Sequence, residues 1–239
     1  MKNEPFISII VPSLNEERYL PRLLKNLVDQ TSRNFEVIHI DGYSDDNTCK
    51  FANKFAKNLP NYKQIISPVR HVSHQRNLGA KTASGRYLLF IDADTQLPPY
   101  YLEGLSFQLH RQPYDMFTTW SVPDIDKPAN HAYTTMVNLA LEASRIIESP
   151  MAIGVLMGCS PKAFKAIGGF SEDATFGEDE DFVKVGHQKN FSFGVYHQPK
   201  FIYSLRRFRS EGTLPTLQQI AVRKLNAITS AKIIKPKDY

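Results

Sequence analysis

Residues 85–95, Gly-Arg-Tyr-Leu-Leu-Phe-Ile-Asp-Ala-Asp-Thr, join a short apolar run to two carboxylates one residue apart. The run from Tyr87 to Ile91 predicts a buried β-strand, because it is brief, apolar and bounded by glycine and charge. Side chains two positions apart on an extended chain point to the same side. We therefore expect Asp92 and Asp94 to face one hard cation, Mg²⁺ or Mn²⁺ carrying a diphosphate. The alternative is that the two acids only solvate a turn.

Strand patterns and helix patterns alternate along the chain. Strands are predicted at Phe6–Val11, Phe35–Ile40, Lys63–Ile66, Tyr87–Ile91, Asp115–Val122 and Met151–Met157. Helices are predicted at about 20–28, 51–59, 75–82, 101–110, 130–147 and 161–167. This order is typical of an α/β fold with a mostly parallel, Rossmann-like sheet flanked by helices. Ligand-binding loops then gather at the carboxyl ends of the strands.

The 239 residues suffice for one α/β domain with a small appendage. We expect a domain over residues 1–210 and a C-terminal basic helical tail over 211–239, packed on the domain or at a membrane surface. Apolar residues recur at helical spacing within Leu214–Ile234. The 29 Lys and Arg against 24 Asp and Glu leave a net charge of +5, and the excess is concentrated near the C-terminus. Such a tail suits anionic partners, either phosphates or a membrane surface.

Cysteine content and the N-terminus suggest a compartment. Cys49 and Cys159 form no CxxC pattern, which favours a reducing environment. Residues Met1–Pro5 lead directly into a strand without a signal-peptide core, and no apolar run approaches about 18 residues. We expect a cytoplasmic protein that can lie peripherally on the inner membrane face.

Six segments together resemble the family 2 glycosyltransferases, which are inverting, metal-dependent enzymes of the GT-A fold. The segments are Val11–Glu16, Asp41–Thr48, Arg76–Ala80, Phe90–Asp94, Gly168–Phe170 and Glu178–Asp179. The resemblance extends in unbroken order from Ile7 to Arg207. Each segment alone is a weak signal, whereas six at matching spacing are a strong one.

The resemblance implies a donor site for a UDP- or GDP-sugar. Its implied nucleotide contacts are Pro12, Asn15, Glu16, Asp41, Ser44, Arg76 and Asp92. Asp94 would bind the metal directly, and Asp92 would contact the metal or the ribose. The alternatives are that Asp41 only forms a turn and that Arg76 is a charge on a helix surface.

Asp179 matches the aspartate of the family's E-D motif, so the resemblance implies that it is the general base. It would deprotonate an acceptor hydroxyl opposite the diphosphate leaving group. Neighbouring acids would raise its pKa by repulsion between like charges. The alternative is that these acids only favour the N-terminus of a helix.

Arg206 and Arg207 are candidates for binding the donor diphosphate or an acceptor phosphate, because guanidinium groups make bidentate contacts with such anions. The alternative is a solvated basic surface. If the acceptor is a polyprenyl phosphate, its oxygen is already anionic, and Asp179 would position the acceptor rather than deprotonate it.

The chain departs from the family's pattern in two places. Tyr203 stands where relatives often carry a metal-binding histidine, so water or His197 would complete the metal site. A Q-x-x-R-W segment, typical of processive polysaccharide synthases, is absent after the acidic cluster. We therefore expect a non-processive enzyme, hexosyltransferase-like, that transfers a single sugar.

Other nucleotide-binding classes lack their signatures here. Neither G-x-G-x-x-G nor G-x-x-x-x-G-K-[ST] occurs, and Pro12–Glu16 lacks the Gly-rich basic loop of nucleotidyltransferases. No nucleic-acid motif accompanies the basic residues, so no nucleic-acid partner is expected. We expect transfer to a lipid-phosphate or glycan acceptor in cell-envelope polysaccharide synthesis. The alternative from another class is a non-catalytic GT-A-like module that binds a membrane or an anionic polymer.

Overall fold

The computed structural model describes residues 5–146, 151–152, 154–174 and 177–211, which form a seven-stranded mixed sheet flanked by helices. The strands are β1 (Ile7–Ser13), β2 (Phe35–Asp41), β3 (Tyr62–Ile66), β4 (Tyr87–Ile91), β5 (Met116–Pro123), β6 (Leu156–Cys159) and β7 (Phe193–Tyr203). Their order is β3-β2-β1-β4-β6-β5-β7, and only β6 runs antiparallel to its neighbours. The prediction of a mostly parallel Rossmann-like sheet is confirmed.

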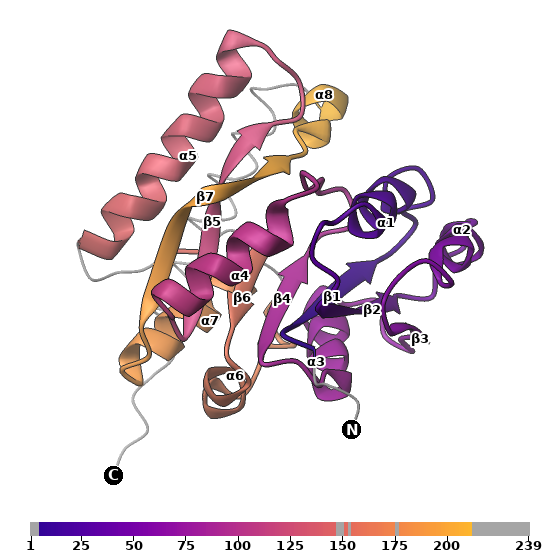
Figure 1. Ribbon diagram of the computed structural model, residues 1–239, viewed down its shortest axis with the longest axis horizontal. Helices are drawn as coiled ribbons and strands as arrows, with labels where there is room; N and C mark the ends of the chain where they lie inside the picture. Colours follow the sequence, from indigo (N-terminus) through magenta and orange to yellow (C-terminus); the bar gives the residue numbers. More distant parts are fainter. Residues whose placement is uncertain (1–4, 147–150, 153, 175–176, 212–239) are drawn as a thin grey trace.

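Helices cover both faces of the sheet (Figure 1). They are α1 (Leu20–Val28), α2 (Thr48–Ala52) with a 3₁₀ turn at Asn53–Phe55, α3 (Val72–Thr82), α4 (Tyr101–Arg111), α5 (Pro128–Ile146), α6 (Pro161–Ile167), α7 (Glu178–Gln188) and α8 (Arg206–Glu211). Helices α1 and α4 pack on one face, and α3, α6 and α7 on the other. The predicted helices within the described residues are confirmed with shifts of a few residues at their ends, except that the helix predicted at about 51–59 is α-helical only to Ala52 and continues as the 3₁₀ turn.

Strand β4 shows how the sheet builds two cores. Leu89 and Ile91 contribute to the core under α1 and α4, whereas Leu88 and Phe90 contribute to the core under α6 and α7. All five residues of β4 are buried, because side chains of a central strand alternate between two covered faces. The acids that follow β4 are therefore held on a rigid central strand.

Helix α1 follows from its apolar stripe. Leu20, Leu23, Leu24 and Leu27 have no exposed surface, and Pro21 occupies the first turn, where its missing N–H is tolerated. Burial of each leucine contributes about 1.5–3 kcal/mol relative to exposure. This helix fixes the position of the loop that leaves β1.

The structure corrects two strand predictions. The strand predicted at Met151–Met157 is wrong at its start, because β6 spans only Leu156–Cys159. Strand β7 has no counterpart among the predicted strands, because its apolar pattern is interrupted by the exposed polar residues His197 and Gln198, where the pairing with β5 is irregular. Ser160 caps α6 by accepting a hydrogen bond from the Ala163 N–H (3.1 Å).

The predicted tail helix Leu214–Ile234 lies outside the described residues, so the division at residue 210 stays a prediction. Among the residues that the structure describes, none of the helices is long and apolar enough to cross a bilayer.

Gly85 precedes β4 and allows the backbone there to approach Ser8 of β1 closely. A Cβ atom there would lie 2.6 Å from both the backbone N and Oγ of Ser8. We expect Gly85→Ala to lower the free energy of unfolding by about 1–3 kcal/mol in urea denaturation. The matched control is Gly104→Ala within α4, whose Cβ would meet Pro199 at an ordinary 3.4 Å. This control should be neutral or stabilising by up to about 1 kcal/mol. Equal effects at both positions would contradict the close approach.

Candidate active site

A pocket of about 210 Å³ opens where β1 and β4 end at the same edge of the sheet. Its lining residues are Pro12, Ser13, Leu14, Glu16, Arg70, His71, Val72, Gln75, Asp92, Ala93, Asp94 and Arg206. Parallel strands bring their carboxyl ends together at such an edge, where open α/β sheets bind ligands. The structure thus brings five of the sequence-predicted site residues into one pocket: Pro12, Glu16, Asp92, Asp94 and Arg206.

The loop after β1 is bonded to the loop after β2. The Asn15 N–H donates to Ser44 Oγ (2.9 Å), and Asn15 Oδ1 accepts from the Asp45 N–H (2.8 Å). The Glu16 N–H donates to Thr48 Oγ1 (2.8 Å). Asn15 has φ +56°, a conformation that asparagine tolerates better than most residues. Asn15 and Ser44 therefore shape the pocket wall from behind, and their contact with a nucleotide stays a prediction.

Asp41 lies behind the pocket wall, where it is 1% exposed. Its carboxylate accepts hydrogen bonds from Ser13 Oγ (3.1 Å) and from the Ser44 N–H (2.8 Å) and Oγ (2.6 Å). Ser13 Oγ also contacts His39 Nε2 (2.7 Å), and burial lowers the pKa of His39 to about 4. These bonds hold Ser13 in the pocket. A contact between Asp41 and a nucleotide stays a prediction.

The two acids after β4 do not continue an extended chain. The chain turns directly after Asp92, and the Thr95 N–H donates to the Asp92 carbonyl (3.0 Å). Asp92 pairs with Arg76 (3.1 Å), whereas Asp94 pairs with Arg206 (2.9 Å). The expectation that an extended chain points both acids the same way is wrong. Both carboxylates nevertheless line the pocket, because the turn folds Asp94 back toward it.

Arg76 is buried, with 3% of its side chain exposed, and ties three segments together. Its guanidinium donates to Asp92 Oδ1 (3.1 Å), Glu178 Oε1 (2.7 Å) and the Gly154 carbonyl (2.9 Å). Its Cζ lies 5.3 Å from the ring centroid of Phe170. The alternative of a helix surface charge is therefore wrong. Arg76 joins the end of β4 to the N-terminus of α7, and its contact with a nucleotide stays a prediction.

Asp179 lies in the first turn of α7, across Gly154 from Arg76. A Cβ atom on Gly154 would lie 3.3 Å from both Arg76 Nη2 and Asp179 Oδ2. The pKa of Asp179 is raised to about 6, first by burial and then by the negative charges of Glu178 and Glu180, whereas the positive charge of Arg76 opposes the rise. Burial thus has a larger effect than the repulsion between acids that the sequence suggests. A carboxylate with this pKa is suited to accept a proton near neutral pH.

Asp92 also has a carboxyl group whose pKa is raised. Burial raises the pKa of Asp92 to about 6, although the positive charge of Arg76 lowers it and Asp94 raises it. Its side chain is 35% exposed toward the pocket. Most of the Asp92 side chain is therefore enclosed by protein, and the remainder is accessible to a ligand in the pocket.

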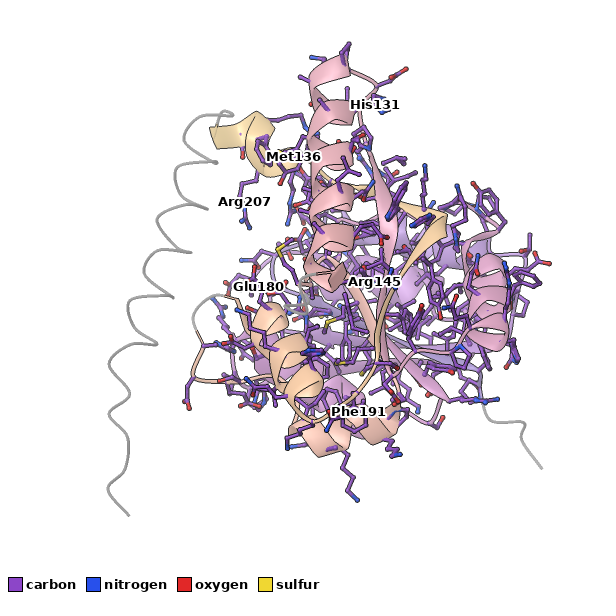
Figure 2. The ribbon with its side chains drawn as sticks, turned by 90° about the vertical axis from the view of Figure 1, so that its left-hand side faces the viewer. His131, Met136, Arg145, Glu180, Phe191 and Arg207 are labelled. Atoms are coloured by element: carbon purple, nitrogen blue, oxygen red, sulfur yellow. The ribbon has the colours of Figure 1, made fainter. Side chains whose placement is uncertain are left out.

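Arg206 is the first residue of α8 and reaches into the pocket. Both terminal nitrogens of its guanidinium donate hydrogen bonds to the Glu16 carboxylate (2.6 and 2.5 Å). Its Cζ lies 4.5 Å from the ring centroid of Tyr19. The alternative of a solvated basic surface is therefore wrong for Arg206. Arg207 is exposed, and Figure 2 shows its side chain leaving α8 on the side of the molecule where Glu180 lies. A role for Arg207 in binding phosphate stays a prediction.

The acids around the pocket fit a divalent cation. The carboxylates of Glu16, Asp92, Asp94, Glu178 and Asp179 surround Arg76 and Arg206, and the third arginine, Arg70, pairs with Asp45, so negative charge is in excess. Within the described parts of the chain, no three His, Cys, Asp or Glu side chains are grouped to hold a metal ion. Mg²⁺ is commonly bound by one or two carboxylates, with waters and substrate phosphates completing its coordination. Asp92 and Asp94 therefore fit a Mg²⁺ or Mn²⁺ that binds with a diphosphate.

Tyr203 lies near these two acids. Burial raises the pKa of its hydroxyl, and Tyr133 and the negative charges of Asp92 and Asp94 raise it further. The hydroxyl of Tyr203 is therefore neutral at physiological pH. A neutral phenol offers a hydrogen bond beside the carboxylates rather than the anionic ligand that a metal prefers.

His197 belongs to a different cluster. Its ring stacks on Trp120 with centroids 4.1 Å apart, and its Nε2 contacts Glu142 of α5 (2.9 Å). The structure therefore provides no support for His197 as a ligand beside Asp94.

Three polar residues of the pocket were not assigned to the site from the sequence. Arg70 pairs with Asp45 (2.7 Å), Gln75 Nε2 donates to the Ser13 carbonyl (3.1 Å), and His71 has a buried Nδ1 with no partner. His71 and Gln75 frame the start of α3, which carries Arg76. Their place before the R-N-x-G segment was the available signal.

Arg76 compensates buried acids, so its removal leaves them unpaired. We expect Arg76→Gln to lower the free energy of unfolding by about 3–5 kcal/mol in urea denaturation at neutral pH. The matched control is Arg86→Gln, an exposed arginine that lies 5.9 Å from the Phe6 ring. This control should change stability by about 0.5 kcal/mol or less. A loss below about 1 kcal/mol for Arg76→Gln would contradict its burial with two acids.

Asp179 should destabilise the folded protein at neutral pH. The folded state holds its proton up to a pKa of about 6, above the ordinary 3.8, so stability falls as pH rises between these values. We expect Asp179→Asn to be more stable than the wild type at neutral pH by on the order of 2 kcal/mol, with little difference near pH 4. Thermal unfolding across this pH range measures the effect. Asp181→Asn, a change at an exposed acid of α7, should show no such gain, and an equal gain there would contradict the prediction.

Comparisons with known proteins agree with this geometry. The family described as Glycosyl transferase family 2 matches residues 8–168. An uncharacterized glycosyltransferase of Haemophilus influenzae is 30% identical over 205 residues, covering 81% of this chain and 66% of the relative. A PGL/p-HBAD biosynthesis glycosyltransferase of Mycobacterium bovis is 39% identical over 94 residues, covering 39% of this chain and 37% of the relative. The chain therefore spans two thirds of these relatives or less.

Two solved structures share the fold. S. aureus TarS in complex with UDP-GlcNAc superposes with a TM-score of 0.69 at 22% identity, covering 83% of this chain and 58% of that one. The mannosyltransferase PcManGT from Pyrobaculum calidifontis, in complex with GDP-Man and Mn²⁺, gives 0.66 at 19% identity, covering 84% and 57%. The family match extends over more than half of the chain and includes the pocket residues from Pro12 to Asp94, with both acids after β4, whereas Arg206 lies outside it. The chain belongs to family 2 of the glycosyltransferases.

Proposed function

We propose that the protein is an inverting, metal-dependent glycosyltransferase that moves one sugar from a nucleotide-diphosphate sugar to a lipid-linked or glycan acceptor. The observation that carries the proposal is the placement of two sets of acids around Arg76. Asp92 bonds to Arg76 and lines the pocket, whereas Asp179 is not among the lining residues and lies with Arg76 beside Gly154. Such an arrangement suits a donor in the pocket and an acceptor approaching from α7.

The pocket has the chemistry that a nucleotide diphosphate requires. Hydrogen-bonding groups of Ser13 and Gln75 line one part, and Asp92, Asp94 and Arg206 line another. Mg²⁺ or Mn²⁺ held by Asp94 and Asp92 would supply neutralisation of the charge that develops on the diphosphate. Arg206 adds a cation that can bind a phosphate oxygen. The similar proteins in complex with UDP-GlcNAc and GDP-Man support a UDP- or GDP-sugar as the donor.

Asp179 carries the proton transfer in this proposal. Its raised pKa leaves it ionised near neutral pH while still basic enough to accept a proton from an acceptor hydroxyl. The hydroxyl oxygen would then attack the anomeric carbon on the face opposite the diphosphate, which inverts the configuration. If the acceptor is a lipid phosphate, its oxygen needs no base, and Asp179 would position the acceptor.

We expect Asp94→Ala to abolish metal-dependent binding of the donor. A thermal-shift panel of UDP- and GDP-sugars, with and without Mn²⁺, measures the rise in Tm that bound donor produces. Asp126→Ala removes an acid that is 99% exposed and is the matched control, which should behave as the wild type. If no donor stabilises the wild type, weight moves to a non-catalytic binding module. An unchanged shift in Asp94→Ala would contradict the metal assignment.

Asp179→Asn should separate binding from chemistry. We expect the variant to bind the donor as the wild type does, while transfer to a hydroxyl acceptor falls by about 10²–10⁴-fold because the base is lost. Radiolabelled sugar transfer measures the rate, and the thermal shift measures binding. Full turnover to a lipid phosphate with lost turnover to a hydroxyl would assign Asp179 as a base for hydroxyls only. Wild-type turnover to both acceptors would contradict its catalytic role.

A further inference from the structure

Arg206 makes an unusually complete set of contacts for a residue that lines a ligand pocket. Its two terminal nitrogens bond to Glu16, and its Nε bonds to Asp94 Oδ2 (2.9 Å). The ring of Tyr19 covers one face of the guanidinium at 4.5 Å. Arg206 is thus a fixed positive charge inside the pocket.

The contact with Asp94 conflicts with metal binding. Asp94 is the acid that we propose as the direct metal ligand, and one of its oxygens is bonded to the guanidinium. A divalent cation on the same carboxylate would stand within a few ångströms of Arg206, and two like charges repel strongly at that distance inside a protein. Arg206 and the metal therefore compete for Asp94.

Arg206 has a second anchor that lets it leave Asp94 without leaving the site. The bidentate pair with Glu16 does not involve Asp94, and Glu16 is only 13% exposed. Helix α8 is held independently, because the Leu205 N–H donates to Asp124 Oδ1 (3.3 Å) and Arg209 pairs with Asp124 (2.9 Å). Asp94 can therefore be freed by a movement of the Arg206 side chain while helix α8 stays in place.

We propose that Arg206 is a resident cation that the divalent metal must displace from Asp94, and that a diphosphate anion assists this exchange by giving the guanidinium a new partner. The inference rests on the proposed function, because it takes Asp94 as the metal ligand. The metal and the donor then bind with positive coupling. The metal must break the pair between Arg206 and Asp94, and the diphosphate lowers that cost by accepting hydrogen bonds from the guanidinium. Arg206 positions the metal and the diphosphate in sequence, and the metal alone binds weakly.

The test measures Mn²⁺ binding to the full-length protein without any sugar donor. Electron paramagnetic resonance of free Mn²⁺ gives the Kd directly. We expect Arg206→Gln to bind Mn²⁺ about tenfold more tightly than the wild type or better, because the competing charge is gone. Arg209→Gln is the matched control: it removes an arginine of the same helix that pairs with Asp124 outside the pocket, and it should leave the Kd unchanged.

A second variant and a second ligand test the proposed exchange further. Arg206→Lys retains one positive charge but cannot reach both acids, so an intermediate Kd is expected, and circular dichroism checks that each variant is folded. Addition of UDP should tighten Mn²⁺ binding more in the wild type than in Arg206→Gln, because the coupling depends on the guanidinium. Equal coupling in both would overturn the exchange.

An equal or weaker affinity of Arg206→Gln for Mn²⁺ would overturn the proposal. Loss of Mn²⁺ binding when Asp94→Ala is added to Arg206→Gln would support it, because the gained site must be Asp94. If that double variant kept the gained affinity, both the exchange and the metal assignment of the proposed function would be wrong. If Arg206→Gln gained no affinity while Asp94→Ala abolished donor binding, only the exchange would be wrong.

Discussion

Two arginines hold together the carboxylates that gather at one edge of the sheet. Parallel strands place their following loops side by side, so the acids after β1 and β4 and those of α7 meet in a small volume. Unpaired carboxylates there would repel one another and lose hydration. Arg76 and Arg206 supply the compensating charge. Arg76 is fully enclosed and links β4, α7 and the turn before β6, so the geometry of the site depends on it.

The two arginines do not balance all of the negative charge of these carboxylates, and the remaining charge suits the chemistry that we propose for the site. Burial raises the pKa of both Asp92 and Asp179 to about 6, because the positive charge of Arg76 offsets only part of the rise. A residual negative charge favours a divalent cation, and a carboxylate of raised pKa is a better base. The same features lower the stability of the fold at neutral pH, an opposition between stability and function that is common at active sites.

The C-terminal part of the described chain completes a pocket that begins at the N-terminus. Arg206 and Glu16 are 190 positions apart, yet their side chains form a bidentate pair. Helix α8 is fixed through Asp124, which follows β5. The position of Arg206 in the pocket therefore depends on the packing of the second half of the sheet. The guanidinium of Arg206 thus joins the start of α8 to the loop after β1 and to the turn after β4.

Local patterns in the sequence determined most of the strands and helices, the acids at the carboxyl ends of β2 and β4, and the resemblance to family 2. Apolar periodicity predicts such elements because it reports which side of a short segment is buried. Strand β7 was not predicted, because the exposed polar residues His197 and Gln198 interrupt its periodicity. Only the tertiary structure decided that Arg76 is buried, that Asp92 and Asp94 pair with different arginines, and that burial dominates the pKa of Asp179. These properties depend on side chains 16, 102 and 190 positions apart, whose approach is set by the packing of helices on the sheet and leaves no periodic trace in the sequence.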